Sequence, residues 1–154
     1  MKYNKERNKK IIGWVLLISW MILIFYMSGK SGEESSSQSN LVYNIIKYIG
    51  INLDVRFAEV SIIMIRKGAH FLEYMILYIL SYNLIKRYIK CKSVYLYPII
   101  IVFLYACTDE FHQLFIQGRA GKFIDVCIDT VGGTFGFIII YVKNIVLKFI
   151  KLRD

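Results

Sequence analysis

Histidine and carboxylate side chains recur at helical spacing in three apolar stretches of the chain. Glu73 follows His70 by three residues, and His112 follows Asp109 by the same interval, so each pair lies on one face of a helix. Asp129 lies in a third apolar stretch. An imidazole beside a carboxylate can transfer protons near neutral pH, and such pairs on facing helices can also bind a metal ion. The pattern therefore predicts acid–base or metal-assisted chemistry.

Other polar residues lie on the same helical faces or beside them. Arg119 is in the short, turn-forming segment 117–122, where its guanidinium group could bind a carboxylate of the protein or an anion that arrives from outside. We predict catalytic roles for His70, Glu73, Asp109, Glu110, His112 and Asp129, and substrate binding by Lys67, Gln113, Arg119 and Asp125. If the site uses a divalent metal ion, the candidate ligands are His70, Glu73, Asp109 and His112.

The elements that must position these residues are membrane helices. Apolar residues form 56% of the 154 residues and the mean hydropathy is +0.48. They gather in runs of about twenty, which is the length that crosses the hydrocarbon core of a bilayer, and this excludes a soluble globular enzyme. We predict one all-α domain over residues 1–154, an integral membrane bundle whose four transmembrane helices span 11–28, 68–85, 94–116 and 123–142.

The segment between the first two of these helices, residues 29–65, is expected to be an extracytoplasmic loop. Within it, Leu41, Ile45 and Ile49 recur at a spacing of four, which indicates a short interfacial helix in the segment 41–65. The preceding Ser39-Asn40 suits an N-cap for that helix.

Positive charge gathers on one side of the predicted membrane. The net charge is +9, and thirteen of the twenty Lys and Arg residues lie in the segments 2–10, 86–92 and 143–153. Because Lys and Arg resist translocation, we expect these segments, and with them both termini, to be cytoplasmic. The excess charge is then explained by anionic lipid head groups, and no nucleic-acid partner is expected.

In this topology three acids lie at one depth in the outer half of the membrane. Glu73, Asp109 and Asp129 are each about 8–10 Å below the outer interface, where an acid is stable only if it faces the interior of the bundle. Asp129 shares a helical face with Gly132 and Gly136, whose spacing lets a neighbouring helix approach closely. The polar faces of the three helices are therefore expected to converge on a pocket that opens outward.

The sequence blocks that carry these residues resemble those of the VanZ-like family of small bacterial membrane proteins. The blocks are 28–35, 66–74, 109–115, 118–119 and 125–136. The likeness spans residues 12–141. It implies a multi-pass protein of the bacterial cytoplasmic membrane and an association with resistance to teicoplanin, a lipid-bearing glycopeptide antibiotic.

Two functional interpretations stand. In the first, the pocket is an acid–base or metal-dependent hydrolase or transferase at the outer leaflet, and it acts on an amphiphile of the cell envelope, such as a phospholipid, a lipid-linked cell-wall precursor or a lipoglycopeptide. In the second, the protein is not an enzyme. It binds a ligand or handles lipids or protons, and the charged residues mainly clamp the helices together.

Overall fold

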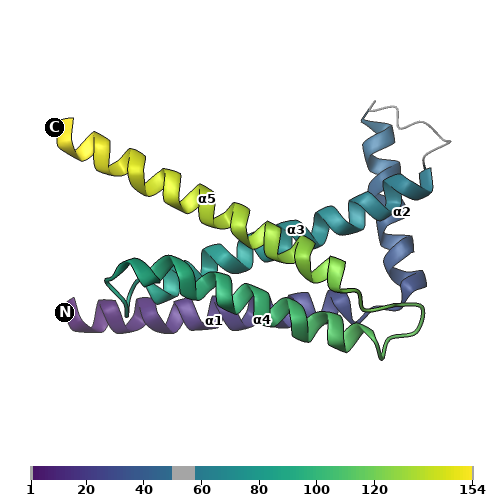
Figure 1. The fold of residues 1–154 in the computed structure, drawn as a ribbon, viewed down its shortest axis with the longest axis horizontal. Coiled ribbons are helices and arrows are strands. Elements are labelled where there is room, and N and C mark those ends of the chain that lie inside the picture. The colour runs from purple at the N-terminus through teal and green to yellow at the C-terminus, as the bar shows by residue number, and fades with distance from the viewer. Residues whose placement is uncertain (1, 50–57, 154) are drawn as a thin grey trace.

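The computed structural model describes residues 2–49 and 58–153, and the regular structure in that part of the chain is entirely helical (Figure 1). The all-α prediction is thereby confirmed. The elements in chain order are α1 (Lys2–Ser28), α2 (Gly32–Tyr48), α3 (Ala58–Ile85), the short 3-10 helix η2 (Lys92–Tyr95), α4 (Leu96–Gln113) and α5 (Phe123–Arg153).

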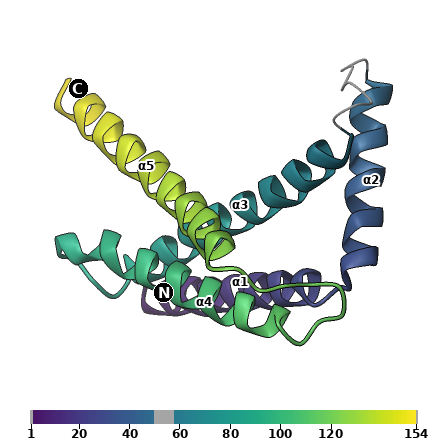
Figure 2. The ribbon, with the colours of Figure 1, turned by 45° about the vertical axis from the view of Figure 1, so that its right-hand side comes forward.

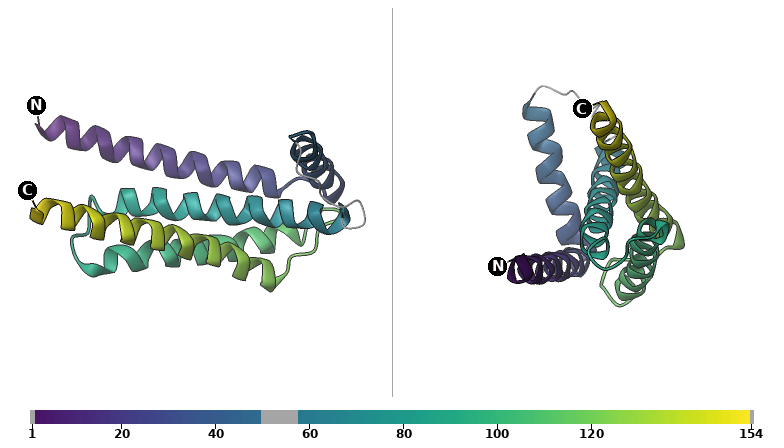
Figure 3. Two further views of the ribbon diagram at one scale, coloured as in Figure 1. Left: turned by 90° about the horizontal axis from the view of Figure 1, so that it is seen from above. Right: turned by 90° about the vertical axis from the view of Figure 1, so that its left-hand side faces the viewer.

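Four of the helices run along the length of the molecule. Helices α1, α3, α4 and α5 lie lengthwise, and both termini are at one end, together with the connection from α3 to η2 (Figure 3). Helix α2 crosses the opposite end, between the end of α1 and the beginning of α3 (Figure 2). The segments that carry most of the positive charge are therefore at the end of the bundle away from α2.

Within residues 2–49 and 58–153, three helices are long and apolar enough to cross a membrane, by length and composition. They span Tyr3–Ser28, Lys92–Gln113 and Phe123–Arg153. Helix α3 has 28 residues but does not reach the same hydropathy, because polar side chains such as His70, Glu73 and Asn83 interrupt it. Three of the four predicted spans are thus supported, and the span at 68–85 stays a prediction.

Helix α2 lies within the segment 29–65 and corrects the bounds of the helix predicted there. The helix begins at Gly32, because the side chain of Ser31 accepts a hydrogen bond from the Glu34 amide at 3.2 Å and the Glu34 carboxylate accepts one from the Ser31 amide at 3.2 Å. The predicted N-cap at Ser39-Asn40 is therefore wrong. Of the interfacial helix predicted in 41–65, residues 50–57 lie outside the described residues, and the part from residue 58 onward belongs to α3.

The face of α2 that packs inward is polar. Ser35, Ser39 and Tyr43, spaced by four residues, are buried, and α2 contacts α3. The predicted apolar stripe is on the outside of the molecule, since Leu41 and Ile45 are both exposed. The serine-rich segment therefore forms the packed side of a helix.

The capping box gives a direct test of how α2 is held. Ser31→Ala removes the hydroxyl acceptor, and we expect it to cost about 1 kcal/mol and to speed amide hydrogen exchange in the first turns of α2. The matched control is Ser37→Ala, which removes an exposed hydroxyl from the same helix. Equal exchange rates in the two variants would contradict the capping role.

Glycines bring α5 into close contact with its neighbours. A Cβ atom at Gly132 would overlap the carbonyl group of Phe71 in α3, and one at Gly136 would lie 2.8 Å from the carbonyl oxygen of Met75. Gly133, on the adjoining face, packs against Val102 of α4. The close approach predicted for the Gly132 and Gly136 face is confirmed, and its partner is α3.

Tyrosines of α3 form much of the hydrophobic core of the bundle. Tyr74, Tyr78 and Tyr82, spaced by four, are buried, together with Leu77. The Tyr78 hydroxyl donates to the carbonyl oxygen of Tyr95 at 3.2 Å. One face of α3 is thus buried in the bundle along several turns.

Candidate functional site

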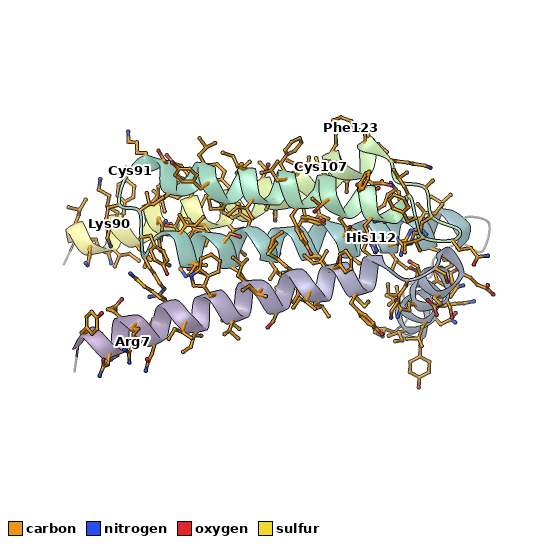
Figure 4. The ribbon with its side chains drawn as sticks, turned by 90° about the horizontal axis from the view of Figure 1, so that it is seen from below. Arg7, Lys90, Cys91, Cys107, His112 and Phe123 are labelled. Carbon is orange, nitrogen blue, oxygen red and sulfur yellow. The ribbon has the colours of Figure 1, made fainter. Side chains whose placement is uncertain are left out.

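The candidate site lies at the end of the bundle that α2 crosses. Figure 4 shows Arg7 and Lys90 near one end and His112 and Phe123 near the other. His70 of α3, Asp109 of α4 and Asp129 of α5 converge there, and each offers one ligand atom within 4.8 Å of the other two. Polar side chains from three helices therefore lie close together at this end of the bundle.

Packing explains why these side chains meet. Asp129 lies one turn before Gly132 and Gly133, whose contacts set the separation of α5 from α3 and α4. His70 immediately precedes Phe71, the residue whose carbonyl group faces Gly132. Asp109 and Asp129 are each 1% exposed, so both carboxylates are removed from solvent.

Hydrogen bonds hold Asp109 in one orientation. Its Oδ2 atom accepts from the Ser28 hydroxyl at 2.9 Å and from the Gln113 amide at 3.3 Å. The same Gln113 nitrogen donates to the Ser28 oxygen at 2.8 Å. Ser28, at the end of α1, is absent from the predicted site residues, although it begins one of the blocks on which the family resemblance rests.

Glu110 and Gln113 hold the loop between α4 and α5. Glu110 accepts from the Lys122 amide at 2.8 Å and from the Gln113 side chain at 3.2 Å, so both of its oxygens are engaged. Arg119 donates to the Gln113 side-chain oxygen at 3.3 Å and to the Lys30 carbonyl oxygen at 3.2 Å. These contacts make Glu110 and Gln113 positioning residues for Arg119.

The backbone of this loop also contacts α2. The Gly32 amide donates to the Gln117 carbonyl oxygen at 3.1 Å, and Gly118 has a φ of 72°, which residues with a Cβ atom rarely adopt. The loop can therefore approach the start of α2 closely.

Arg119 in this loop keeps its positive charge. Burial lowers the pKa of its guanidinium group, and the like charge of Arg66 lowers it further, but an arginine in a protein remains a cation at neutral pH.

Two cavities adjoin at these residues. A polar cavity of about 200 Å³ is lined by α3, the loop and the beginning of α5. A more apolar cavity of about 150 Å³ lies between α2 and α3, with Met27, Val42 and Ile65 among its lining residues. We call these the polar cavity and the apolar cavity.

Three residues line both cavities: Arg66, His70 and Arg119. Arg66 forms no salt bridge with another residue in the described part of the chain. It is missing from the predicted site, although it lies four residues before His70 and therefore on the same helical face. The spacing of four residues between Arg66 and His70 is the sequence signal that could have placed Arg66 in the predicted site.

Lys67 and Asp125, both predicted to bind substrate, form a salt bridge with each other at the wall of the polar cavity. Glu73 lines the apolar cavity, and its Oε2 atom is 3.7 Å from Nδ1 of His70. These three residues therefore border the site, and Lys67 and Asp125 neutralise each other.

The structure does not bring His112 to His70. The His112 ring stacks on Phe25 of α1, with 4.1 Å between ring centroids and 27° between planes. It lines a separate hollow between α1 and α4. Three helical residues correspond to a rotation of about 300°, so His112 is displaced by about 60° from the Asp109 direction, toward α1. His112 is therefore not brought together with the other candidate metal ligands at His70.

Comparison with known proteins gives one family match. The model of a family described as VanZ/LLP1 matches residues 13–146, a region that includes every residue of the candidate site. No curated protein and no solved structure gives a match.

Proposed function

The chain belongs to the VanZ/LLP1 family, and from this premise we propose that it is a bacterial membrane protein that binds the anionic head group of an amphiphile in its polar cavity. The neighbouring apolar cavity accommodates the part of the acyl chain next to the head group. The other expected partners, a lipid-linked cell-wall precursor or a lipoglycopeptide, share this chemistry of a charged head on an apolar tail.

The observation that carries the proposal is the pair of arginines between the two cavities. Arg66 and Arg119 line both of them, and Arg66 has no carboxylate partner among the described residues. A guanidinium group binds phosphate or carboxylate oxygens through two parallel hydrogen bonds. An anion at this boundary would contact both arginines while its tail extends toward Met27 and Val42.

We propose that both termini are cytoplasmic, that α3 is the fourth transmembrane helix and that the cavities face the outer leaflet. The thirteen cations of the segments 2–10, 86–92 and 143–153 support this orientation, because these segments lie at the end of the bundle opposite α2 (Figures 3 and 4), and α2 forms one wall of the apolar cavity. The positive-inside rule assigns that end to the cytoplasm.

A second candidate function is hydrolysis or group transfer on the bound amphiphile. One observation favours it: His70 lines both cavities and lies beside Glu73, as a general acid or base at a head group must. Teicoplanin resistance, which the family resemblance implies, fits either function. Binding requires fewer assumptions, because it depends only on the arginines and the cavities.

The binding proposal is tested with the full chain in nanodiscs of phosphatidylcholine that contain a rising fraction of phosphatidylglycerol. We expect phosphatidylglycerol to bind preferentially and Arg66→Gln to weaken it about tenfold or more, since a hydrogen bond to a charged group contributes about 1.5–3 kcal/mol. The control is Arg7→Gln, which removes an exposed cation at the opposite end.

Equal affinities in Arg66→Gln and Arg7→Gln would contradict a head-group site at Arg66. Resistance is measured separately, as the teicoplanin concentration that stops growth of a susceptible host expressing each variant. If the cavity carries resistance, Arg66→Gln loses it and Arg7→Gln retains it at equal expression.

A further inference from the structure

Three buried polar atoms beside the polar cavity, one each from α3, α4 and α5, have no hydrogen-bond partner among the described residues. They are Oδ1 of Asp109, Oδ2 of Asp129 and Nδ1 of His70. Both carboxylates are 1% exposed. Since a buried polar atom without a partner is costly, these atoms indicate a ligand that the protein atoms do not supply.

Neither carboxylate forms a salt bridge with a described residue. In the described part of the chain no lysine or arginine forms a salt bridge with Asp109 or Asp129, because Lys67 pairs with Asp125 and Arg119 contacts Gln113. Two unpaired carboxylates in a buried cluster must be neutralised by protons or by a positive ion. The three atoms without hydrogen-bond partners belong to residues of three helices whose ligand atoms lie close together. This arrangement favours a single ion bound among them.

We propose that His70, Asp109 and Asp129 bind one divalent metal ion, of the class of Mn²⁺ or Zn²⁺. One imidazole nitrogen and two carboxylate oxygens form a mixed donor set that suits these ions better than Mg²⁺ or Ca²⁺, which prefer oxygen ligands alone. The proposal stands apart from head-group binding, since it requires neither Arg66 nor the apolar cavity.

The geometry is close to that of an assembled site. Ligand atoms about 2.1 Å from an ion lie about 3–4 Å from one another, so the observed mutual distances of up to 4.8 Å require only a small inward rotation of the side chains. Ser28 and Gln113 already hold Oδ2 of Asp109, which leaves its Oδ1 atom for the ion. Such hydrogen bonds to a ligating carboxylate are typical of metal centres.

The remaining coordination positions of the ion would face the polar cavity, because His70 and Asp129 both line it. The ligand set differs from the sequence-based one in three residues, Glu73, His112 and Asp129. Asp129 replaces His112, which stacks on Phe25 in a separate hollow, and Glu73 borders His70 instead of joining the three ligands.

The test uses the purified full chain, stripped with a chelator and then dialysed against Mn²⁺, Zn²⁺, Mg²⁺ or Ca²⁺. Elemental analysis is expected to find one Mn²⁺ or Zn²⁺ per chain and little Mg²⁺ or Ca²⁺. The melting temperature should rise with the concentration of the bound ion, because the ion binds only the folded state. If the wild-type chain contains no ion at saturating Mn²⁺ and Zn²⁺, the proposal is wrong. Protons then neutralise the two carboxylates.

Variants locate the ion. Asp129→Asn and His70→Gln should each weaken binding at least tenfold, whereas Glu33→Gln, which removes an exposed acid in the first turn of α2, should retain it. In the ion-free state Asp129→Asn should be at least as stable as the wild type, because the wild type must then neutralise two buried carboxylates and the variant only one. If Glu33→Gln loses the ion and Asp129→Asn keeps it, the proposed ligand set is wrong.

Discussion

Gln113→Glu is expected to leave little folded protein. The Gln113 side chain donates to the Ser28 hydroxyl, Asp109 and Glu110, and it accepts from Arg119. A glutamate has no N–H to donate and adds a third carboxylate beside two others. Each buried acceptor left without a partner costs about 1–3 kcal/mol, and the repulsion between like charges adds to that loss.

The measurement is the yield of monodisperse protein and its melting temperature in one detergent. Gln117→Glu is the matched control, because it makes the same chemical change on an exposed side chain in the neighbouring loop. Gln113→Leu separates the two causes, since it removes the donors without adding charge and should be intermediate. If Gln113→Glu melts at the temperature of Gln117→Glu, this network does not hold α1, α4 and the loop together.

Gly132→Leu is expected to separate α5 from α3. A Cβ atom at this position already overlaps the carbonyl group of Phe71, and backbone cannot move aside as a side chain can. Overpacking by even small groups costs about 1–3 kcal/mol, and leucine adds four carbons where the first does not fit. We expect loss of folded protein, and loss of the His70 to Asp129 contact in any fraction that survives.

Gly68→Leu is the matched control for Gly132→Leu. Gly68 is in α3, near the same site, but a Cβ atom there meets no other atom within 4 Å. Replacing an exposed helix glycine with a residue of higher helix propensity should leave the melting temperature unchanged or raise it by the equivalent of about 0.5–1 kcal/mol. A similar loss in both variants would show that the close approach at Gly132 is not what holds α5.

The two proposals concern different residues in and beside the polar cavity, and each has its own test. Arg66 and Arg119 are at the boundary of the polar and apolar cavities and concern an anionic head group, whereas His70, Asp109 and Asp129 concern a cation beside the polar cavity. Arg66→Gln should weaken phosphatidylglycerol binding without removing Mn²⁺ or Zn²⁺. Failure of one proposal therefore leaves the other intact.

Much of the helical organisation was predictable from the sequence. Apolar runs of membrane-spanning length place α1, α4 and α5, and their ends are set by local residues such as the turn-forming segment 117–122. The start of α2 was predictable as well, since Ser31 and Glu34 have the spacing of a capping box. It was missed because the serine-rich composition of the segment favoured a loop.

The sequence by itself determined the helical class, the three long apolar helices and the side of each helix on which the acids lie, because these follow from local hydropathy and the helical repeat. Only the tertiary structure decided that Asp129, and not His112, joins His70 and Asp109, and that Ser28 of α1 holds Asp109. Periodicity gives directions around one helix axis. The rotation of each helix relative to the others is set by packing, here by the fit of Gly132 against the Phe71 backbone.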